Sequence, residues 1–316
     1  MTRSALSHSF DVLSIGEALI EFNQVQAAPP TYLQGFGGDT SNAIIAAARA
    51  GARCAYLTLL GDDHWGQRLL DIWSSEKVDV SGVRRLPGCA TGLYFVHHDA
   101  RGHHFSYARS GSAASRMQAS ELDGIWGDIL AQSQWLHVSG ISLAISASAR
   151  ELVLQAMQQA RQHGVKVALD TNLRLSLWPL ELARQTLTKA AALCDLLLPS
   201  LEDMTQLTGQ HDPQEIAGIC HAWGASEVVL KLGAQGAQIS RSGQLSRVPG
   251  WSVQAVDATG AGDCFCGNLL ARLTQGDDLA QACLWANAAA ALSVQGHGAI
   301  APLPSAGQVR EFLALK

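Results

Sequence analysis

A run of small residues that ends in a carboxylate is the part of the sequence best suited to chemistry. Residues 256–263 read VDATGAGD, and a helix is predicted directly after them at about 264–273. The backbone N–H groups of Gly260, Ala261 and Gly262 can point into one concavity at a helix N-terminus, which suits a phosphate. Asp263 would repel that anion unless it accepts a proton from an alcohol that attacks the phosphorus atom. The alternative is a glycine-rich turn in which Asp263 only caps the helix.

A second glycine-rich stretch enters another predicted helix near the N-terminus. Residues 35–42 read GFGGDTSN, in which Gly37 and Gly38 allow a ligand to approach the backbone closely. Asp39 and Asn42 suit hydroxyl groups better than phosphate, so this stretch predicts a sugar or polyol site. A tight turn followed by a helix cap is the alternative, because the same residue types form turns and caps. Neither stretch has the GxxxxGK[ST] pattern of a Walker A loop.

The elements that must position these stretches follow an alternating pattern. We predict strands at 11–15, 54–60, 135–138, 165–169, 196–198 and 228–230. One helix is predicted at 41–50, and another includes 153–160 and ends at Gly164. Further helices are predicted from about residue 231 to the C-terminus. This alternation predicts an α/β fold with a doubly wound, mostly parallel sheet and helices on both of its faces. Ligands bind beyond the carboxyl ends of the strands in such sheets, so polar residues directly after an apolar run are site candidates.

Two regions depart from the alternation. Residues 92–96 and 104–107 flank a turn at 99–102, which is the signature of a β-hairpin. Together with residues 18–36, the hairpin predicts a small β-sheet inserted from about 18–36 and 91–109 into one domain that covers 1–316. A small sheet that projects over a strand-end site is a natural lid. The alternative is a sheet extension that serves packing alone.

Composition limits the classes of function. The chain has 316 residues, of which 47% are hydrophobic and 16% charged, so a large core is expected and disorder is not. The net charge of -5 argues against a protein that binds nucleic acid or a membrane surface. Seven cysteines without a metal-type spacing and the lack of an apolar N-terminal segment favour a reduced, cytoplasmic protein.

The two glycine-rich stretches, taken together and in this order, resemble the two signatures of the PfkB (ribokinase-like) carbohydrate kinase family. The N-terminal signature is matched by 37–51 and the C-terminal one by 257–263, and the resemblance covers nearly the whole chain. It implies an α/β core with a β-sheet lid, ATP and Mg²⁺ as cofactors, and phosphorylation of a sugar hydroxyl. It further implies Asp263 as the base, with charge on the phosphoryl group stabilised by the amides of 260–262. The ATP-binding residues it implies are Ser200, Lys231, Gly233, Gly236, Gly260, Gly262 and Asn287.

Other segments resemble the 2-keto-3-deoxygluconate kinase branch of the family. These segments are 92–94, 107–115 and 170–178. A 2-keto-3-deoxy sugar acid carries a carboxylate, and guanidinium groups bind carboxylates with charge-assisted bonds. Arg109 and Arg174 are therefore expected to hold the substrate, with Tyr94 and Tyr107 as hydroxyl donors or packing residues. A fructokinase or another neutral-sugar kinase is the alternative within the family, and a non-catalytic sugar or nucleotide sensor is the alternative from another class.

The sequence departs from the family pattern near the expected metal site. Where the family often has Asn-x-x-Glu, Ser200 and Asp203 stand in place of the Asn and the Glu. Asp203 can hold Mg²⁺ through water, and Glu202 could substitute for it. A monovalent cation such as K⁺ is plausible near Asp257 and 296–298. A lid with an exposed edge also predicts a homodimer through the lid.

Overall fold

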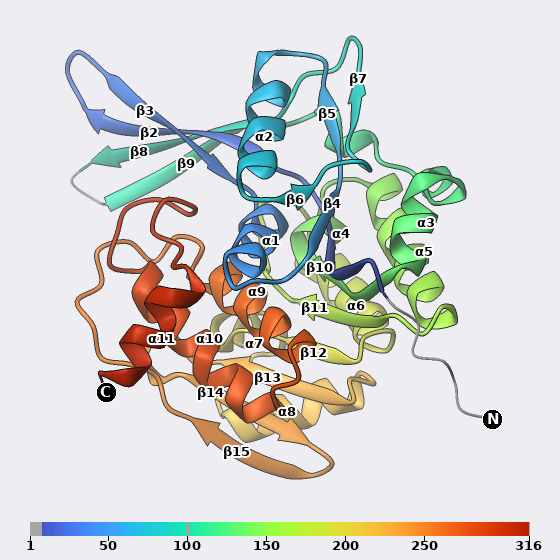
Figure 1. Ribbon diagram of the computed structural model, residues 1–316, viewed down its shortest axis with the longest axis vertical. Coiled ribbons are helices and arrows are strands. Elements are labelled where there is room, and N and C mark those ends of the chain that lie inside the picture. The colour runs from blue at the N-terminus through green and yellow to red at the C-terminus, as the bar shows by residue number, and fades with distance from the viewer. Residues whose placement is uncertain (1–7, 100–101, 316) are drawn as a thin grey trace.

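The larger sheet of the protein has its strands in the predicted parallel arrangement. The computed structural model describes residues 8–99 and 102–315, and Figure 1 shows the path of the chain. Along the sheet the order is β15, β14, β13, β12, β11, β10, β1, β4 and β6. Strands β13 to β6 in that order pair in parallel, and β14 and β15 pair antiparallel at one end. Their bounds are β1 Phe10–Ile15, β4 Cys54–Leu57, β6 Val78–Asp79, β10 Ser133–Ser139, β11 Lys166–Asp170, β12 Leu196–Leu198, β13 Glu227–Lys231, β14 Ala237–Arg241 and β15 Gln244–Val248.

Helices cover both faces of this sheet and bury an apolar cluster on each side. On one face lie α1 Asp39–Arg49, α2 His64–Ser75, α9 Ala261–Thr274, α10 Leu279–Ser293 and α11 Ala306–Ala314. On the other lie α3 Ile125–Ala131, α4 Gly140–Ala144, α5 Ala147–Gln162, α6 Leu180–Ala191, α7 Leu201–Thr208 and α8 Pro213–Ala222. Short 3₁₀ helices span Ala114–Arg116, Ala119–Asp123 and Gly233–Gln235. The predicted doubly wound α/β fold is confirmed.

A separate small sheet is built from the two regions that break the alternation. It consists of β2 Leu19–Gln26, β3 Thr31–Gly37, β8 Leu93–Asp99 and β9 Gly102–Ala108, in the order β3, β2, β8, β9. Figure 1 shows these strands projecting from one side of the molecule. The predicted hairpin is present as β8 and β9, while residues 100 and 101 of its predicted turn lie outside the described residues.

Two predictions about elements are wrong in detail. The strand predicted at 54–60 is divided at Thr58, because the Thr58 carbonyl accepts a hydrogen bond of 3.2 Å from the amide of Arg84. The second half, β5 Leu59–Gly61, pairs with β7 Arg84–Leu86 outside the main sheet. The C-terminal part is not all helical, since β14 and β15 form a hairpin. Its turn at Ser242 and Gly243 has φ of 50° and 76°, the left-handed backbone that two-residue hairpin turns need.

The carboxyl ends of the central parallel strands meet at one edge of the sheet. The chain runs from β1 to β4 and β6 in one direction and from β10 to β13 in the other, so the order reverses beside β1. Ligand sites of open α/β sheets lie at such a reversal. Polar residues lie at the ends of these strands or within two residues beyond them: Glu17, Ser139, Asp170, Ser200 and Lys231.

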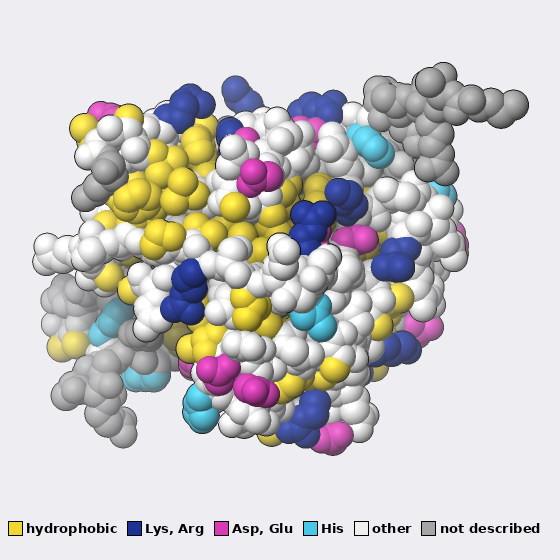
Figure 2. Space-filling model, turned by 90° about the horizontal axis from the view of Figure 1, so that it is seen from below, with side chains coloured by type: hydrophobic (Ala, Val, Ile, Leu, Met, Phe, Trp, Pro, Cys, Tyr) yellow, Lys and Arg dark blue, Asp and Glu magenta, His cyan; other side chains and the backbone are white. Residues whose placement is uncertain are grey.

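The surface of the molecule carries dispersed charges. On the face that Figure 2 shows, Lys and Arg side chains are scattered among acidic and uncharged ones rather than gathered into one basic area. Within the described part of the chain, no helix is both long and apolar enough to cross a membrane.

Candidate functional site

Asp263 lies in the first turn of α9 with its side chain buried. The helix starts at Gly260, whose φ of 74° is left-handed and whose Cβ would lie 3.2 Å from Ala299. No side chain caps this helix within the described residues, whereas the neighbouring α7 and α10 are capped by Ser200 and Asp278. The first-turn amides of α9 are therefore not claimed by a capping oxygen, and this end of the helix suits an anion such as a triphosphate.

The second glycine-rich stretch meets the first at this point. Gly38 has φ of 114°, and a Cβ there would lie 2.5 Å from the carbonyl oxygen of Glu17, so only glycine fits. The next turn of α1 carries Asn42, whose Nδ2 donates to Oδ2 of Asp263 over 2.8 Å. Asp39 and Asn42 each keep a buried Oδ1 atom with no hydrogen-bond partner among the described residues. Two such acceptors side by side suit the hydroxyl groups of a sugar.

Burial and neighbouring carboxylates set the electrostatics of this pair. Burial, followed by the charge of Asp39, raises the pKa of Asp263 to about 7, against the lowering effect of the Asn42 bond and Lys231. Burial also raises the pKa of Asp39 above its usual range. A carboxyl group with a pKa near neutrality can take a proton from an alcohol and release it again.

A buried ion pair lies close to Asp263, beside the start of α9. The Nζ of Lys231, at the end of β13, is 2.8 Å from Oδ2 of Asp170, at the end of β11. Although burial opposes it, the ammonium of Lys231 lowers the pKa of Asp170 below its usual range, so this carboxylate is ionised at neutral pH. A Cβ on Gly262 would lie 3.5 Å from the same Nζ, which places Lys231 against the start of α9.

The other residues predicted to bind ATP lie in a helix cap, in a loop contact and in a turn. Ser200 caps α7 by accepting a hydrogen bond from the amide of Asp203 over 3.0 Å. Asn287 donates to the carbonyl oxygens of Val248 and Pro249, so its amide holds the loop after β15. Gly233 and Gly236 both have left-handed φ, of 58° and 90°, in the turn between β13 and β14.

The predicted metal residue Asp203 faces the same edge of the sheet. Its Oδ2 accepts a hydrogen bond of 2.8 Å from Oγ1 of Thr171, and its side chain is buried. In the described residues no group of three or more His, Cys, Asp or Glu side chains could hold a metal ion. The single carboxylate of Asp203 fits Mg²⁺, because Mg²⁺ usually binds through substrate phosphates, water and one or two carboxylates rather than in an all-protein cage.

The small sheet contributes aromatic and charged side chains to the site. Tyr94 on β8 donates its hydroxyl to Glu21 on β2, and a Cβ on Gly37 would lie 2.4 Å from that hydroxyl oxygen. Tyr107 on β9 stacks on Tyr94 with ring centroids 6.0 Å apart. Burial, followed by the charge of Glu21, raises the pKa of Tyr94 above its usual range, so its hydroxyl remains a donor.

The two arginines predicted to bind a carboxylate differ in their surroundings. Arg109 forms a buried ion pair with Glu17 and lies 5.8 Å from the ring centroid of Tyr107. Arg174 is exposed, and its Nη1 donates to the carbonyl oxygen of Leu173 over 2.7 Å. Its charge lowers the pKa of Asp39 and Asp203 against larger opposing effects, which places its guanidinium within electrostatic range of the site.

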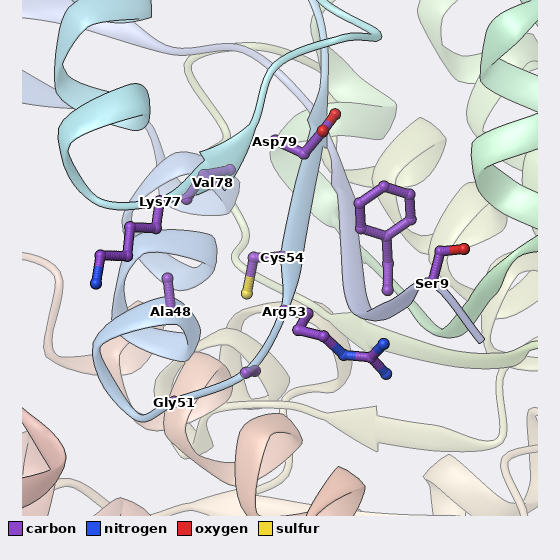
Figure 3. Close-up of a pocket in the computed structure, with 10 residues that line it drawn as sticks. Ser9, Ala48, Gly51, Arg53, Cys54, Lys77, Val78 and Asp79 are labelled. Atoms are coloured by element: carbon purple, nitrogen blue, oxygen red, sulfur yellow. The ribbon is translucent and has the colours of Figure 1, made fainter. Parts of the chain in front are cut away.

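A hollow of about 620 Å³ lies at the other end of the sheet, near the amino ends of β1, β4 and β6. Figure 3 shows its lining, in which the side chains of Arg53 and Lys77 point in different directions. Arg53 is already paired with Asp11 over 2.6 Å. None of the predicted site residues belongs to the described lining, so we place the functional site at the carboxyl edge.

Sequence reasoning missed four residues of the site: Glu17, Glu21, Asp170 and Asn172. Asp170 ends β11 and Glu17 lies two residues beyond β1, so the rule that selects polar residues near strand ends would have found them. Glu21 lies within a strand, and Asn172 lies two residues beyond one. For Glu21 the local sequence offers no signal, because its role depends on contacts with distant segments. Asn172 belongs to the segment 170–178 that resembles the kinase branch, but nothing local indicates that its side chain lies between Asp39 and Asp263.

Comparison with known proteins identifies relatives of this chain. The family described as "pfkB family carbohydrate kinase" matches residues 9–306. The chain is 34% identical to a 2-dehydro-3-deoxygluconokinase of Thermoproteus tenax over 96% of this chain and 94% of that protein. It is also 34% identical to the enzyme of that name from Escherichia coli K12, over 91% and 96%. A fructokinase-1 of rice is 33% identical over 96% and 97%.

Solved structures resemble the whole fold. A PfkB protein from Polaromonas sp. JS666 superposes with a TM-score of 0.86 and 30% identity, covering 96% of this chain and 99% of that one. A putative ribokinase II from Escherichia coli in complex with ATP and Mg²⁺ gives a TM-score of 0.87 at 26% identity, with the same coverage.

Proposed function

The chain belongs to the pfkB family of carbohydrate kinases and is a sugar kinase, and we propose that it phosphorylates the terminal hydroxyl of 2-keto-3-deoxygluconate. This compound is the 2-dehydro-3-deoxygluconate named in the relatives from Thermoproteus tenax and Escherichia coli. The observation that carries the chemistry is the buried Asp263, held by Asn42 at the uncapped start of α9. The hydroxyl oxygen bonds to the γ-phosphorus of ATP as the bond to the β-phosphate breaks, so the products are 2-keto-3-deoxy-6-phosphogluconate and ADP.

In this proposal ATP supplies the phosphoryl group, with Mg²⁺ to neutralise charge on its phosphates. Asp263 accepts the proton of the attacking hydroxyl, and Asn42 keeps the carboxylate turned toward it. The amides of Gly260, Ala261 and Gly262 stabilise the negative charge that develops on the transferring group. The nucleotide would be bordered by Ser200, Lys231, Gly233, Gly236 and Asn287, and Asp203 would hold Mg²⁺ through water.

The sugar is oriented by groups from both sheets. The free acceptors of Asp39 and Asn42 take sugar hydroxyls, and Gly37 and Gly38 let the sugar approach the backbone. Because Glu17 already neutralises Arg109, Arg174 carries most of the attraction for the substrate carboxylate. Tyr94 and Tyr107 close the sugar pocket from the small sheet, which acts as a lid.

A neutral-sugar kinase is the second candidate, and one observation favours it. The pairing of Arg109 with Glu17 leaves less positive charge free to bind the carboxylate of a sugar acid. A panel of sugars assayed for ATP turnover distinguishes the candidates. We expect the highest kcat/KM on 2-keto-3-deoxygluconate, whereas fructose as the best substrate would overturn the proposal. Nucleotide binding without turnover on any sugar would favour a sensor.

Arg174→Ala sharpens this test. A charge-assisted bond contributes enough that its loss lowers kcat/KM for the keto acid by roughly 10- to 100-fold, with little effect on fructose. The matched control is Arg116→Ala, which removes an exposed arginine outside the site. Equal losses on both sugars would contradict the carboxylate role of Arg174.

The proposal also includes a site for a monovalent cation such as K⁺. Asp257 accepts hydrogen bonds from the amides of Thr259 and Gly298, which ties together the loops where that cation would bind.

The proposal further includes a homodimer and a cytoplasmic location. The exposed apolar side chains of the lid support a homodimer. All seven cysteines are free thiols, which supports a reducing, cytoplasmic location.

A further inference from the structure

Asn172 has an unusual backbone for its position. It lies just beyond β11 with φ of 28°, and its side chain is only 8% exposed. The other described residues with positive φ, apart from glycines, are Lys77 and Ser242, and both are exposed. A buried, left-handed residue at a site is a reason to look for a role of its side chain, since such strain is retained where the surroundings enforce it.

The ion pair between Lys231 and Asp170 holds the backbone of Asn172 in place. Its amide donates to Oδ1 of Asp170 over 3.2 Å. The other oxygen of Asp170 accepts from Nζ of Lys231 at 2.8 Å and faces Sγ of Cys266 at 3.3 Å. Lys231 and Cys266 therefore hold the carboxylate of Asp170 in place. Through its bond to the amide of Asn172, that carboxylate in turn fixes the direction of the Asn172 side chain.

The side-chain amide of Asn172 points between two carboxylates. Its Nδ2 is 3.3 Å from Oδ2 of Asp39 and 3.4 Å from Oδ1 of Asp263. A primary amide nitrogen carries two hydrogen atoms, so it can serve one carboxylate with each. The second oxygen of Asp263 is bonded to Asn42, so the two asparagines approach the two oxygens of Asp263 from different elements.

We propose that Asn172 is a positioning residue, which places one neutral pair of donors between the sugar-binding Asp39 and the base Asp263. The side-chain amide of Asn172 keeps the carboxylates of Asp39 and Asp263 oriented, and it can donate to both of them when both are ionised. An amide suits this task because it donates to the ionised base without adding a full positive charge that would weaken its affinity for the proton. This inference rests on the proposed function, in which Asp263 is the base.

Several ionisable groups face Asp263 and would remain after a change at Asn172. The groups whose charges interact with the base are Asp39 on α1, Asp170 on β11, Lys231 on β13, Tyr94 on β8, and the thiols of Cys264 and Cys266 on α9. Because a donor to a carboxylate favours its charged form, loss of the amide raises the pKa of Asp263 further.

The decisive variant is Asn172→Gly, because glycine adopts the left-handed backbone without strain and removes only the amide. We expect the acidic limb of the kcat/KM profile to move up by about half to one pH unit. At pH values well below the apparent pKa, that shift lowers kcat/KM roughly threefold to tenfold. At about pH 9 the variant should have nearly wild-type kcat/KM. Asn172→Asp replaces the donors by a third carboxylate and should shift the limb further in the same direction. Ser242→Gly, which relieves positive φ outside the site, is the control and should leave the limb unchanged.

The outcomes separate this inference from the proposed function. A loss of equal size at every pH would mean that Asn172 is merely structural and would overturn the inference, as would an unchanged profile. If the glycine variant does not fold, the profile of Asn172→Asp decides by the same criterion. Retained turnover in Asp263→Asn would instead overturn the assignment of the base.

Discussion

A carboxyl group that takes a proton from an alcohol near neutral pH needs a pKa close to that pH. Asp263 meets this need because it is buried beside Asp39, and the two effects raise its pKa to about 7. The base is active when ionised, so kcat/KM should rise with pH and level off above about 7. A profile that stays flat down to about pH 5 would contradict the assignment.

The charge of Asp263 is removed most simply by Asp263→Asn. Asparagine keeps the size of the side chain and can still accept from Asn42, so the sugar should bind with nearly unchanged affinity. Removal of a general base costs roughly 10²- to 10⁴-fold in rate, and we expect kcat to fall by that factor. Single-turnover kinetics together with a sugar-binding measurement checks both parts. Turnover near the wild-type value would contradict the role of Asp263 as base.

At the scale of elements, the site depends on how closely α1 approaches α9. The two helices meet at Gly267, where a Cβ would lie 2.0 Å from the carbonyl oxygen of Ala43 and 2.9 Å from Cβ of Ala46. α1 carries Asp39 and Asn42, and α9 carries Asp263. The absence of a side chain at Gly267 therefore lets the two glycine-rich stretches form one site.

Gly267→Ala tests this contact. The methyl group has no room, so we expect a destabilisation of about 1–3 kcal/mol and a fall in kcat as Asn42 moves away from Asp263. Gly218→Ala in α8 is the control, because that glycine is exposed and a Cβ there meets nothing within 4 Å. Since alanine favours helix, the control should be neutral or slightly stabilising in thermal unfolding. Equal stability of both variants would contradict close packing at Gly267.

The sequence predicts elements well where the pattern is local and poorly where it depends on packing. Apolar runs at 11–15, 165–169 and 196–198 indicate buried strands, because parallel strands covered on both faces need apolar residues throughout. The break at Thr58 and the β14–β15 hairpin depend on a contact with Arg84 and on a two-residue turn. Likewise, Asp39 and Asp263 are visible in glycine-rich motifs. The pairing of Arg109 with Glu17 joins residues 92 positions apart and has no local signature.

For the whole molecule, a net charge of -5 is compatible with anionic substrates because the carboxylates at the site are largely compensated. Lys231 pairs with Asp170, and Arg109 pairs with Glu17. Burial raises the pKa of Asp39, Asp203 and Glu21 above their usual ranges, because it opposes the charged form of each carboxyl group. In the proposed function, attraction for ATP and a sugar acid would therefore rest on the start of α9, Mg²⁺ and the exposed Arg174.

The apolar surface of the small sheet, the proposed lid, bears on how whole molecules associate. Val25, Leu33 and Tyr107 are 63%, 66% and 48% exposed, and all three lie on the small sheet. Its outer strands, β3 and β9, also present edges that a second sheet could cover. Exposed apolar side chains gathered on one element are typical of an interface between subunits. We therefore expect a dimer of about twice 33.5 kDa in which the two lids pack together.

Leu33→Arg combined with Val25→Arg should convert this dimer to a monomer, because two buried guanidinium groups without partners oppose association. Sedimentation velocity measures the change. Leu245→Arg is the control, since that leucine is 42% exposed but lies on β15, away from the lid. If the control dissociates as readily as the lid variant, or if the wild-type chain sediments as a monomer at micromolar concentration, the lids do not form the interface. A monomeric lid variant with weaker sugar binding would further mean that pairing keeps Tyr94 and Tyr107 in place over the sugar.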